Sequence, residues 1–309
     1  MTGKPTVAVL LATYNGASFL EEQLDSIARQ DLPFIDVWAS DDGSTDGTLE
    51  ILKAWRARWS KGVFHVIAGP RQGYVENFRR MMAMKSVGGA YIAFSDQDDV
   101  WDPNKLSYAV KKLDEVQPQA LAMYCGRTRL IGKNGAARGL SPLFARQPDF
   151  GNAIVQSIAG GNTIVLNRAA FNLIHESCLR TSFVSHDWWC YQIVSGAGGT
   201  IIYDPIPRIS YRQHGGNLIG ENQGWVSRMK RLQALAYGRF ADWNVVNIDA
   251  LDRCRDLLDE SGRQTLDGFK AARKSGSLQS LRSLWTHRIH RQTPVSDVAL
   301  YLAAAFGRL

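Results

Sequence analysis

The sequence TVAVLLATYNG, residues 6–16, is an apolar, β-branched run that ends in polar residues, a pattern typical of a buried strand that leads into a loop. Similar runs recur along the chain, separated by segments with apolar residues on one helical face. Strands are predicted at residues 6–12, 35–40, 63–68, 90–95 and 120–130, and helices at residues 20–28, 45–59, 74–86 and 107–116. This alternation indicates an α/β fold with a mostly parallel, doubly wound sheet.

Polar residues follow three of these strands. Thr13, Tyr14 and Asn15 come after the first strand, Asp41-Asp42-Gly43 after the second, and Asp96-Gln97-Asp98-Asp99 after the fourth. Ligands of open α/β sheets bind at the carboxyl ends of the strands. The three loops are therefore predicted to converge on one crevice.

The acidic segment SDQDDVW, residues 95–101, is costly to hold together, because neighbouring carboxylates repel and raise one another's pKa. A bound cation would remove that cost. Oxygen ligands with open coordination positions suit Mg²⁺ or Mn²⁺, which would also bridge a diphosphate. The alternative is a solvated turn with a helix cap at Asp102, and the metal site is the favoured interpretation.

The segment SDDGSTDGT, residues 40–48, is ambiguous alone, because Asp and Ser before a helix are ordinary capping residues. Two consecutive carboxylates exceed what a cap requires. Asp42 has the chemistry to accept a hydrogen bond from the N3–H of uracil or thymine. This segment therefore predicts either a helix cap or a contact to a nucleobase.

Taken together, VLLATYNG, SDDGSTDGT and FSDQDDVW resemble the family 2 glycosyltransferases, which have the GT-A fold and invert the donor anomeric centre. That fold has a Rossmann-like, mostly parallel sheet flanked by helices. The resemblance implies a DXD motif made by Asp96 and Asp98, with Asp98 as a ligand of Mn²⁺ or Mg²⁺. The nucleotide-binding residues that it implies are Thr13, Tyr14, Asn15, Asp41, Asp42, Arg71, Asn77 and Asp96.

The segment HDWW, residues 186–189, supplies a candidate for the general base. The resemblance implies that Asp187 deprotonates the acceptor hydroxyl, as an inverting transfer requires. Trp188 and Trp189 are candidates for stacking on an acceptor sugar, although a tryptophan in this position is at least as often part of the core.

Two further segments follow from the resemblance. In YRQHGGN, residues 211–217, His214 is a candidate metal ligand and Arg212 a candidate diphosphate contact. In GGNT, residues 160–163, Gly161 and Asn162 are candidates for acceptor binding, with turn geometry as the alternative explanation of the glycines.

Within the family, these segments look most like bacterial rhamnosyltransferases of cell-surface polysaccharide assembly. The expected donor is dTDP-L-rhamnose, with a UDP-hexose or UDP-GlcNAc as the alternative. The expected acceptor is a saccharide or a lipid-linked saccharide. Intact Asp42, Asp96, Asp98 and Asp187 argue against a binding module that has lost its activity.

The net charge of +7 and pI near 9.3 suit an anionic partner: a diphosphate, an acidic lipid surface or a nucleic acid. Nucleic acid is disfavoured, because acidic clusters at the strand ends would repel its phosphates. Four cysteines without a CxxC pair predict neither a zinc site nor disulfides, and so a reducing, cytoplasmic location. No stretch has the roughly 18 apolar residues that cross a bilayer, and the N-terminus reads as a strand and not as a signal.

Two regions are predicted: a catalytic region at residues 1–222 and a basic helical region at residues 223–309. In the second region, basic residues interleave with apolar ones at helical spacing, as in a helix that lies on the inner face of a membrane. A solvated face and a homodimer contact are the alternatives. The basic residues are Arg228, Lys230, Arg231, Arg282, His287, Arg288, His290 and Arg291.

Overall fold

The protein is represented by a computed structural model that describes residues 6–117, 119–214 and 239–309. A seven-stranded sheet forms its centre, in the order β10-β6-β9-β4-β1-β2-β3. All neighbours in this sheet are parallel except β9, which is antiparallel to β4 and β6. The strands are β1 (Val7–Thr13), β2 (Ile35–Asp41), β3 (Phe64–Ala68), β4 (Tyr91–Ser95), β6 (Ala122–Gly126), β9 (Val165–Asn167) and β10 (Thr200–Asp204).

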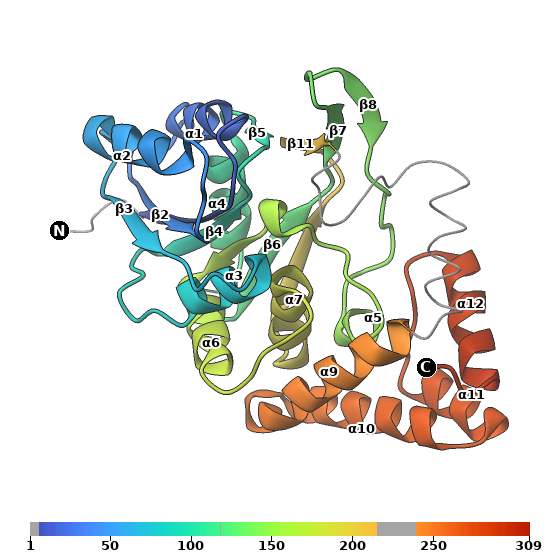
Figure 1. Cartoon of the computed structure of the whole chain (residues 1–309). Coiled ribbons are helices and arrows are strands. Elements are labelled where there is room, and N and C mark those ends of the chain that lie inside the picture. The colour runs from blue at the N-terminus through green and yellow to red at the C-terminus, as the bar shows by residue number, and fades with distance from the viewer. Residues whose placement is uncertain (1–5, 118, 215–238) are drawn as a thin grey trace.

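Helices cover both faces of this sheet (Figure 1). On β1, Val7, Val9 and Leu11 join the core under α1, α2 and α4, whereas Ala8 and Leu10 join the core under α3, α6 and α7. Both sides of β1 are buried because successive side chains point to opposite faces of a strand. These helices are α1 (Leu20–Ala28), α2 (Thr48–Arg58), α3 (Tyr74–Met82), α4 (Lys105–Asp114), α6 (Arg168–Cys178) and α7 (His186–Gly196).

The first four strands and the first three helices that the sequence predicts, up to residue 95, are confirmed, with ends that differ by at most four residues. The strand predicted at residues 120–130 is two strands, β6 and β7 (Arg129–Gly132), which belong to different sheets. The second sheet has the order β5-β11-β7-β8, with β5 (Val100–Trp101), β8 (Ala137–Leu140) and β11 (Ile209–Gln213). Its β11 ends one residue before His214, so this small sheet brings a late segment of the chain to the loop after β4.

The C-terminal helices form a layer beneath α7 and the short α5 (Phe150–Ala153) (Figure 1). Their buried residues, among them Leu251, Phe269 and Leu300, belong to the same apolar cluster as Phe150 and Tyr191. The two predicted regions therefore share one core, and the boundary expected at residues 222/223 lies outside the described residues. The C-terminal helices are α9 (Arg239–Arg253), η2 (Arg255–Leu257), α10 (Glu260–Lys274), α11 (Ser277–Thr286) and α12 (Pro294–Ala305).

In the part of the chain that the structure describes, no helix combines the length and the hydrophobicity needed to cross a membrane.

Candidate active site

Hydrogen bonds join the loops after β1, β2 and β4 into one surface. The Asn15 backbone N–H donates to Ser44 Oγ at 2.8 Å, and Asn15 Oδ1 accepts from the Thr45 backbone N–H at 2.8 Å. The Gln97 side chain accepts from the Tyr14 N–H at 2.7 Å and donates to the Tyr14 carbonyl at 3.0 Å. The predicted convergence of the three loops is confirmed. The Tyr14 side chain on this surface is 58% exposed.

Asp41 and Asp42 both organise backbone, in different loops. The Asp41 carboxylate accepts from Thr13 Oγ1 at 3.0 Å and from the N–H and Oγ of Ser44 at 2.9 and 2.5 Å. Asp42 Oδ1 accepts from the Arg71 N–H at 2.6 Å, and its Oδ2 accepts from the Gly73 N–H at 2.7 Å. Asp42 thereby holds the loop after β3 against the loop after β2.

The other two predicted nucleotide contacts near this loop differ in exposure. Arg71 is exposed, has a left-handed backbone (φ 59°), and places its side chain against Gly43, whose added Cβ would lie 3.0 Å from Arg71 Nε. Asn77 is 1% exposed, and its amide accepts from Ser40 Oγ at 2.5 Å and donates to the Ser40 carbonyl at 2.9 Å. The structure thus places Arg71 at the surface of the site and Asn77 beneath it.

Four carboxyl groups gather where β4 ends. Desolvation and the nearby charges of Asp98 and Asp187 raise the pKa of Asp96 to about 7. Desolvation likewise raises the pKa of Asp98, against the opposing effect of His214, and lifts the pKa of Asp99 well above its usual range. The Asp187 charge acts on Asp96, although about ninety residues separate them in sequence. The structure thus brings Asp187 close to Asp96 at the end of β4.

Asp98 and His214 form the pair with the chemistry of a cation site. His214 Nε2 lies 2.8 Å from Asp98 Oδ2, and both side chains are mostly buried. Among the described residues, no group of three or more His, Cys, Asp and Glu is arranged to hold a metal by itself. One carboxylate and one imidazole beside Asp96 nevertheless fit a Mg²⁺ or Mn²⁺ that takes its other ligands from water and a diphosphate. The raised pKa values around Asp98 are the cost that such a cation would offset.

Arg212 occupies a different position from the one expected of a diphosphate contact. Its side chain is 2% exposed, and its guanidinium donates to the Asp98 carbonyl at 2.9 Å, the Lys133 carbonyl at 3.0 Å and Glu22 Oε2 at 2.6 Å. Arg212 therefore ties the loop that carries the DXD motif, residues 96–99 (the DXD loop), to α1 and to the β7–β8 turn.

Asp99 is a residue whose importance the sequence did not reveal. It is fully buried, and its carboxyl group accepts from Asn162 Nδ2 at 2.6 Å and from the Arg212 backbone N–H at 3.1 Å. Asp99 thus links the DXD loop to β11 and to the 3-10 turn η1 (Gly161–Thr163). The acidic motif predicted a role for its neighbour Asp98, because a motif shows which residues are acidic but not which way each side chain points.

The start of α7 supplies Asp187. Its Oδ1 is shielded from solvent and has no hydrogen-bond partner among the described residues. The preceding His186 is buried, stacks on Phe78 with a centroid distance of 3.9 Å, and lies against Gly161. Burial lowers the pKa of His186 to about 4, so this imidazole is neutral at pH 7. Gly161 is explained by this contact, since a Cβ there would lie 2.2 Å from His186 Nε2.

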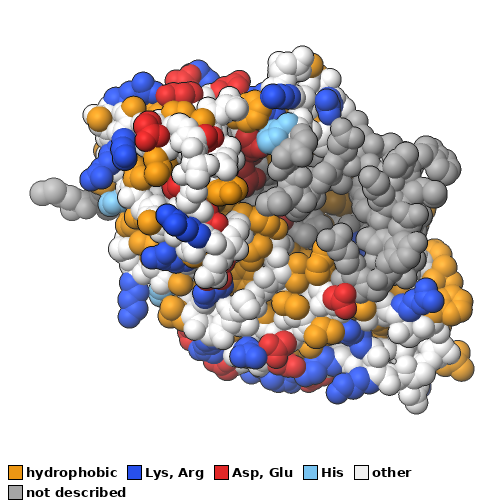
Figure 2. All heavy atoms as spheres, viewed as in Figure 1, with side chains coloured by type: hydrophobic (Ala, Val, Ile, Leu, Met, Phe, Trp, Pro, Cys, Tyr) orange, Lys and Arg blue, Asp and Glu red, His pale blue; other side chains and the backbone are white. Residues whose placement is uncertain are grey.

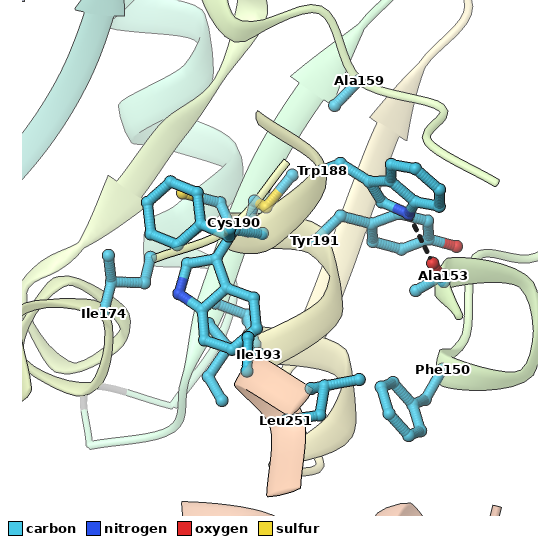
Figure 3. Close-up of a cluster of buried hydrophobic side chains, with 14 of the residues drawn as sticks. Phe150, Ala153, Ala159, Ile174, Trp188, Cys190, Tyr191, Ile193 and Leu251 are labelled. Carbon is cyan, nitrogen blue, oxygen red and sulfur yellow. Dashed lines mark hydrogen bonds between the residues drawn. The ribbon is translucent and has the colours of Figure 1, made fainter. Parts of the chain in front are cut away.

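Trp188 and Trp189 are core residues, which corrects the expectation that they stack on an acceptor sugar. Trp188 is 6% exposed and donates from Nε1 to the Ala153 carbonyl at 2.7 Å (Figure 3). Trp189 is fully buried, donates to Ser177 Oγ at 2.9 Å and stacks on Phe183. The core alternative for Trp188 and Trp189 is confirmed, because both indoles belong to the buried apolar cluster.

Gln97 and Tyr74 are further residues of the site that the motifs did not single out. Gln97 clamps Tyr14, as described above. Tyr74, the first residue of α3, is half-buried, and desolvation together with the charges of Asp187 and Asp96 raises its pKa to about 12. Its phenol is therefore a neutral hydrogen-bonding group beside two carboxylates.

Residues 8–171 match the family model described as glycosyl transferase family 2. The chain is 29% identical over 233 residues to the dTDP-rhamnosyl transferase RfbG of Shigella flexneri, covering 72% of this chain and 78% of that protein. It is 28% identical over 188 residues to the putative teichuronic acid biosynthesis glycosyltransferase TuaG of Bacillus subtilis, covering 58% and 68%. Some relatives are longer: the chain spans 59% of the uncharacterized protein Rv1520 of Mycobacterium tuberculosis, at 26% identity.

Solved structures share the fold. TarS of S. aureus, solved with UDP-GlcNAc, superposes with a TM-score of 0.57 at 19% identity, covering 98% of this chain and 88% of that one. The mannosyltransferase PcManGT of Pyrobaculum calidifontis, solved with GDP-Man and Mn²⁺, gives 0.53 at 18% identity, covering 99% and 87%.

The sheet topology and the superpositions show the GT-A fold expected from the sequence. The chain belongs to glycosyltransferase family 2, and it is similar to a rhamnosyltransferase.

Proposed function

We propose that the protein transfers L-rhamnose from dTDP-L-rhamnose to a hydroxyl group of a saccharide acceptor, free or lipid-linked, in cell-surface polysaccharide synthesis. The similarity to RfbG over most of both chains supports this donor. A UDP-hexose or UDP-GlcNAc is the alternative donor, because uracil and thymine present the same N3–H to a carboxylate such as Asp42.

The reaction that we propose is a direct displacement with inversion, and Asp187 is its general base. The observation that carries this proposal is the unpartnered, shielded Oδ1 of Asp187 beside Asp96. The acceptor oxygen attacks the anomeric carbon while the bond to the diphosphate oxygen breaks, and the hydroxyl proton passes to Asp187.

The diphosphate would lie over the DXD loop. Asp98 and His214 would hold Mn²⁺ or Mg²⁺, and Asp96 would contact the nucleotide beside them. When bound, the cation neutralises the charge that develops on the leaving diphosphate. Arg212 would support the diphosphate site indirectly, since its guanidinium donates to the Asp98 carbonyl and so holds the Asp98 backbone in place.

The nucleoside would lie on the surface made by the loops after β1, β2 and β3. Tyr14 is exposed enough to stack on the base, and each Asp42 oxygen accepts one backbone N–H and so keeps a second lone pair. Thr13, Asn15 and Asp41 would support these contacts, with Arg71 at the open side and Asn77 below. On the acceptor side, Gly161 and Asn162 would shape the floor next to Asp187.

A donor panel tests the proposal: dTDP-rhamnose, UDP-glucose, UDP-galactose and UDP-GlcNAc, each with Mn²⁺ and a saccharide acceptor. Consumption of dTDP-rhamnose at least ~100-fold faster than of the UDP-sugars is the expected result. Preference for a UDP-sugar would select the alternative donor, and no turnover of any donor would contradict the proposed reaction.

The Asp187→Asn variant tests the base. We expect transfer to fall by at least ~100-fold, the usual scale for a general base, with donor binding unchanged. Thermal unfolding with Mn²⁺ and dTDP, together and separately, measures binding in the same variant, because a ligand of the folded state raises the melting temperature. Retained transfer in the variant would contradict the role of Asp187 as general base. If DNA raised the melting temperature of the protein and nucleotides did not, the proposed enzymatic function would be contradicted.

A further inference from the structure

Helix α12 turns an apolar stripe to solvent. Val295, Val298, Leu302 and Phe306 are 78%, 60%, 53% and 74% exposed. Their spacing of three, four and four residues places them on one face of the helix. In Figure 2, hydrophobic side chains gather at the right-hand edge, over the position of α12 in Figure 1. Ordinary surfaces scatter such residues singly, so a contiguous stripe marks a contact surface.

Helix α11 adds a tryptophan and a positive charge. Leu278 and Trp285 are 82% and 76% exposed, and Arg282 lies between them on the same helical face. Helices α11 and α12 pack on each other. The exposed indole is the amphipathic kind of side chain that concentrates where hydrocarbon meets water.

The segment that carries this face is mostly positive in charge. Residues 277–309 contain four arginines, Arg282, Arg288, Arg291 and Arg308, and one acidic side chain, Asp297. Asp297 is already paired with Arg146 at 2.5 Å. A second copy of the chain would bring this same basic face against itself in a two-fold dimer. An anionic phospholipid surface instead offers hydrocarbon to the apolar stripe and phosphates to the arginines.

We propose that α11 and α12 dock the protein on an anionic membrane surface. Their apolar side chains enter the headgroup boundary, and Arg282, Arg288 and Arg308 contact lipid phosphates. A further consequence, which rests on the proposed function, is that the acceptor saccharide is lipid-linked and is reached at that surface.

The test is co-sedimentation of the full chain with two kinds of vesicle. One contains phosphatidylcholine with roughly 30–40% phosphatidylglycerol, and the other contains phosphatidylcholine alone. Binding is expected to the anionic vesicles and to weaken with salt. The double variant Trp285→Ser with Phe306→Ser should bind at least about tenfold more weakly, because it loses buried apolar area. Its matched control is Leu179→Ser with Ile206→Ser, which changes residues that are 59% and 58% exposed elsewhere, and should bind like the wild type.

Absence of binding to anionic vesicles, or equal binding by the Trp285/Phe306 variant and the wild type, would overturn the docking site. So would a dimer in analytical ultracentrifugation that this variant abolishes. Donor turnover with a water-soluble acceptor, measured without vesicles, distinguishes failure of the docking proposal from failure of the proposed function. Normal turnover in the Trp285/Phe306 variant with lost vesicle binding supports docking, and failure of turnover in the wild type would count against the proposed function alone.

Discussion

At the scale of single residues, carboxylates in similar sequence contexts have different tasks because their partners differ. The Asp41 carboxylate accepts hydrogen bonds from Thr13 and Ser44, whereas one oxygen of Asp187 has no hydrogen-bond partner among the described residues. Asp96 and Asp98 differ from both, because desolvation raises the pKa of each carboxyl group. The chemistry therefore depends on which carboxylates the fold leaves unsatisfied.

Asp99→Ala is expected to destabilise the protein by about 2–4 kcal/mol, because the Asn162 amide and the Arg212 N–H lose a shared buried acceptor. Burial and the charges of Asp98 and Asp96 raise the pKa of Asp99, so relief of this repulsion offsets part of the loss. Urea unfolding measures the loss. The control is Asp102→Ala, which breaks a half-exposed ion pair with Arg129 and should cost below about 1 kcal/mol. Equal losses in the two variants would contradict the role given to Asp99.

His186 is expected to make stability depend on pH in the acid range. Its folded pKa of about 4 lies below the unfolded value near 6.5, so the unfolded chain binds the extra proton between these values. The His186 contribution is complete above pH 6.5 and is lost as the pH falls towards 4, by up to about 3 kcal/mol. The unfolding free energy of His186→Phe should show a shallower slope over pH 4–6.5. Parallel slopes would show that His186 does not titrate on unfolding.

The sequence predicted which residues surround the site but not how each one faces. The acidic motifs correctly marked the strand ends, whereas HDWW lies at the start of α7, a helix that the sequence did not predict. Trp189, Asn77 and Arg212 lie beneath the surface because the pleat of a strand and the turn of a helix fix their directions. Those directions depend on element ends to within one residue, which hydrophobic periodicity does not supply.

At the scale of elements, long periodic segments were predictable and short strands were not. β1 and β2 each have seven residues and carry clear apolar runs. β5 has two residues and β9 three, too few to show any period. Their pairing depends on contacts between distant segments, such as Val100 with Ser210. The second sheet, which brings His214 to Asp98, was for this reason not visible in the sequence.

The clamp between the β1 and β4 loops is expected to matter for nucleotide binding. Gln97→Met keeps the side-chain length but removes both hydrogen bonds to Tyr14, each worth about 1 kcal/mol. Affinity for dTDP, measured by calorimetry with Mn²⁺, should fall about tenfold. Gln264→Met, which removes an exposed hydrogen bond to Glu260 on α10, should leave affinity unchanged. Wild-type affinity in Gln97→Met would mean that the Tyr14 loop holds its shape without this clamp.

At the scale of the whole molecule, the C-terminal helices complete the core of the catalytic part. Phe269 and Leu266 on α10 are fully buried in the cluster that includes Tyr191 of α7. The Gly262 backbone also packs so closely on Gly196 that a Cβ there would lie 2.1 Å from the Gly196 carbonyl oxygen. The sequence showed a change of composition near residue 222 and suggested two regions, but composition does not reveal shared packing.

This shared core predicts that the chain unfolds as one unit. Phe269→Ala should cost about 3–5 kcal/mol through the cavity that it leaves, and should lower the melting temperature of the whole protein in a single calorimetric transition. Phe306→Ala, at a phenylalanine 74% exposed at the C-terminal end of α12, should change stability by less than about 0.5 kcal/mol. A bound nucleotide with Mn²⁺ should shift that same transition upward, because unfolding of the helices then also destroys the site. Two transitions, with only one responding to Phe269→Ala and only the other to nucleotide, would show that the helices are a separate domain.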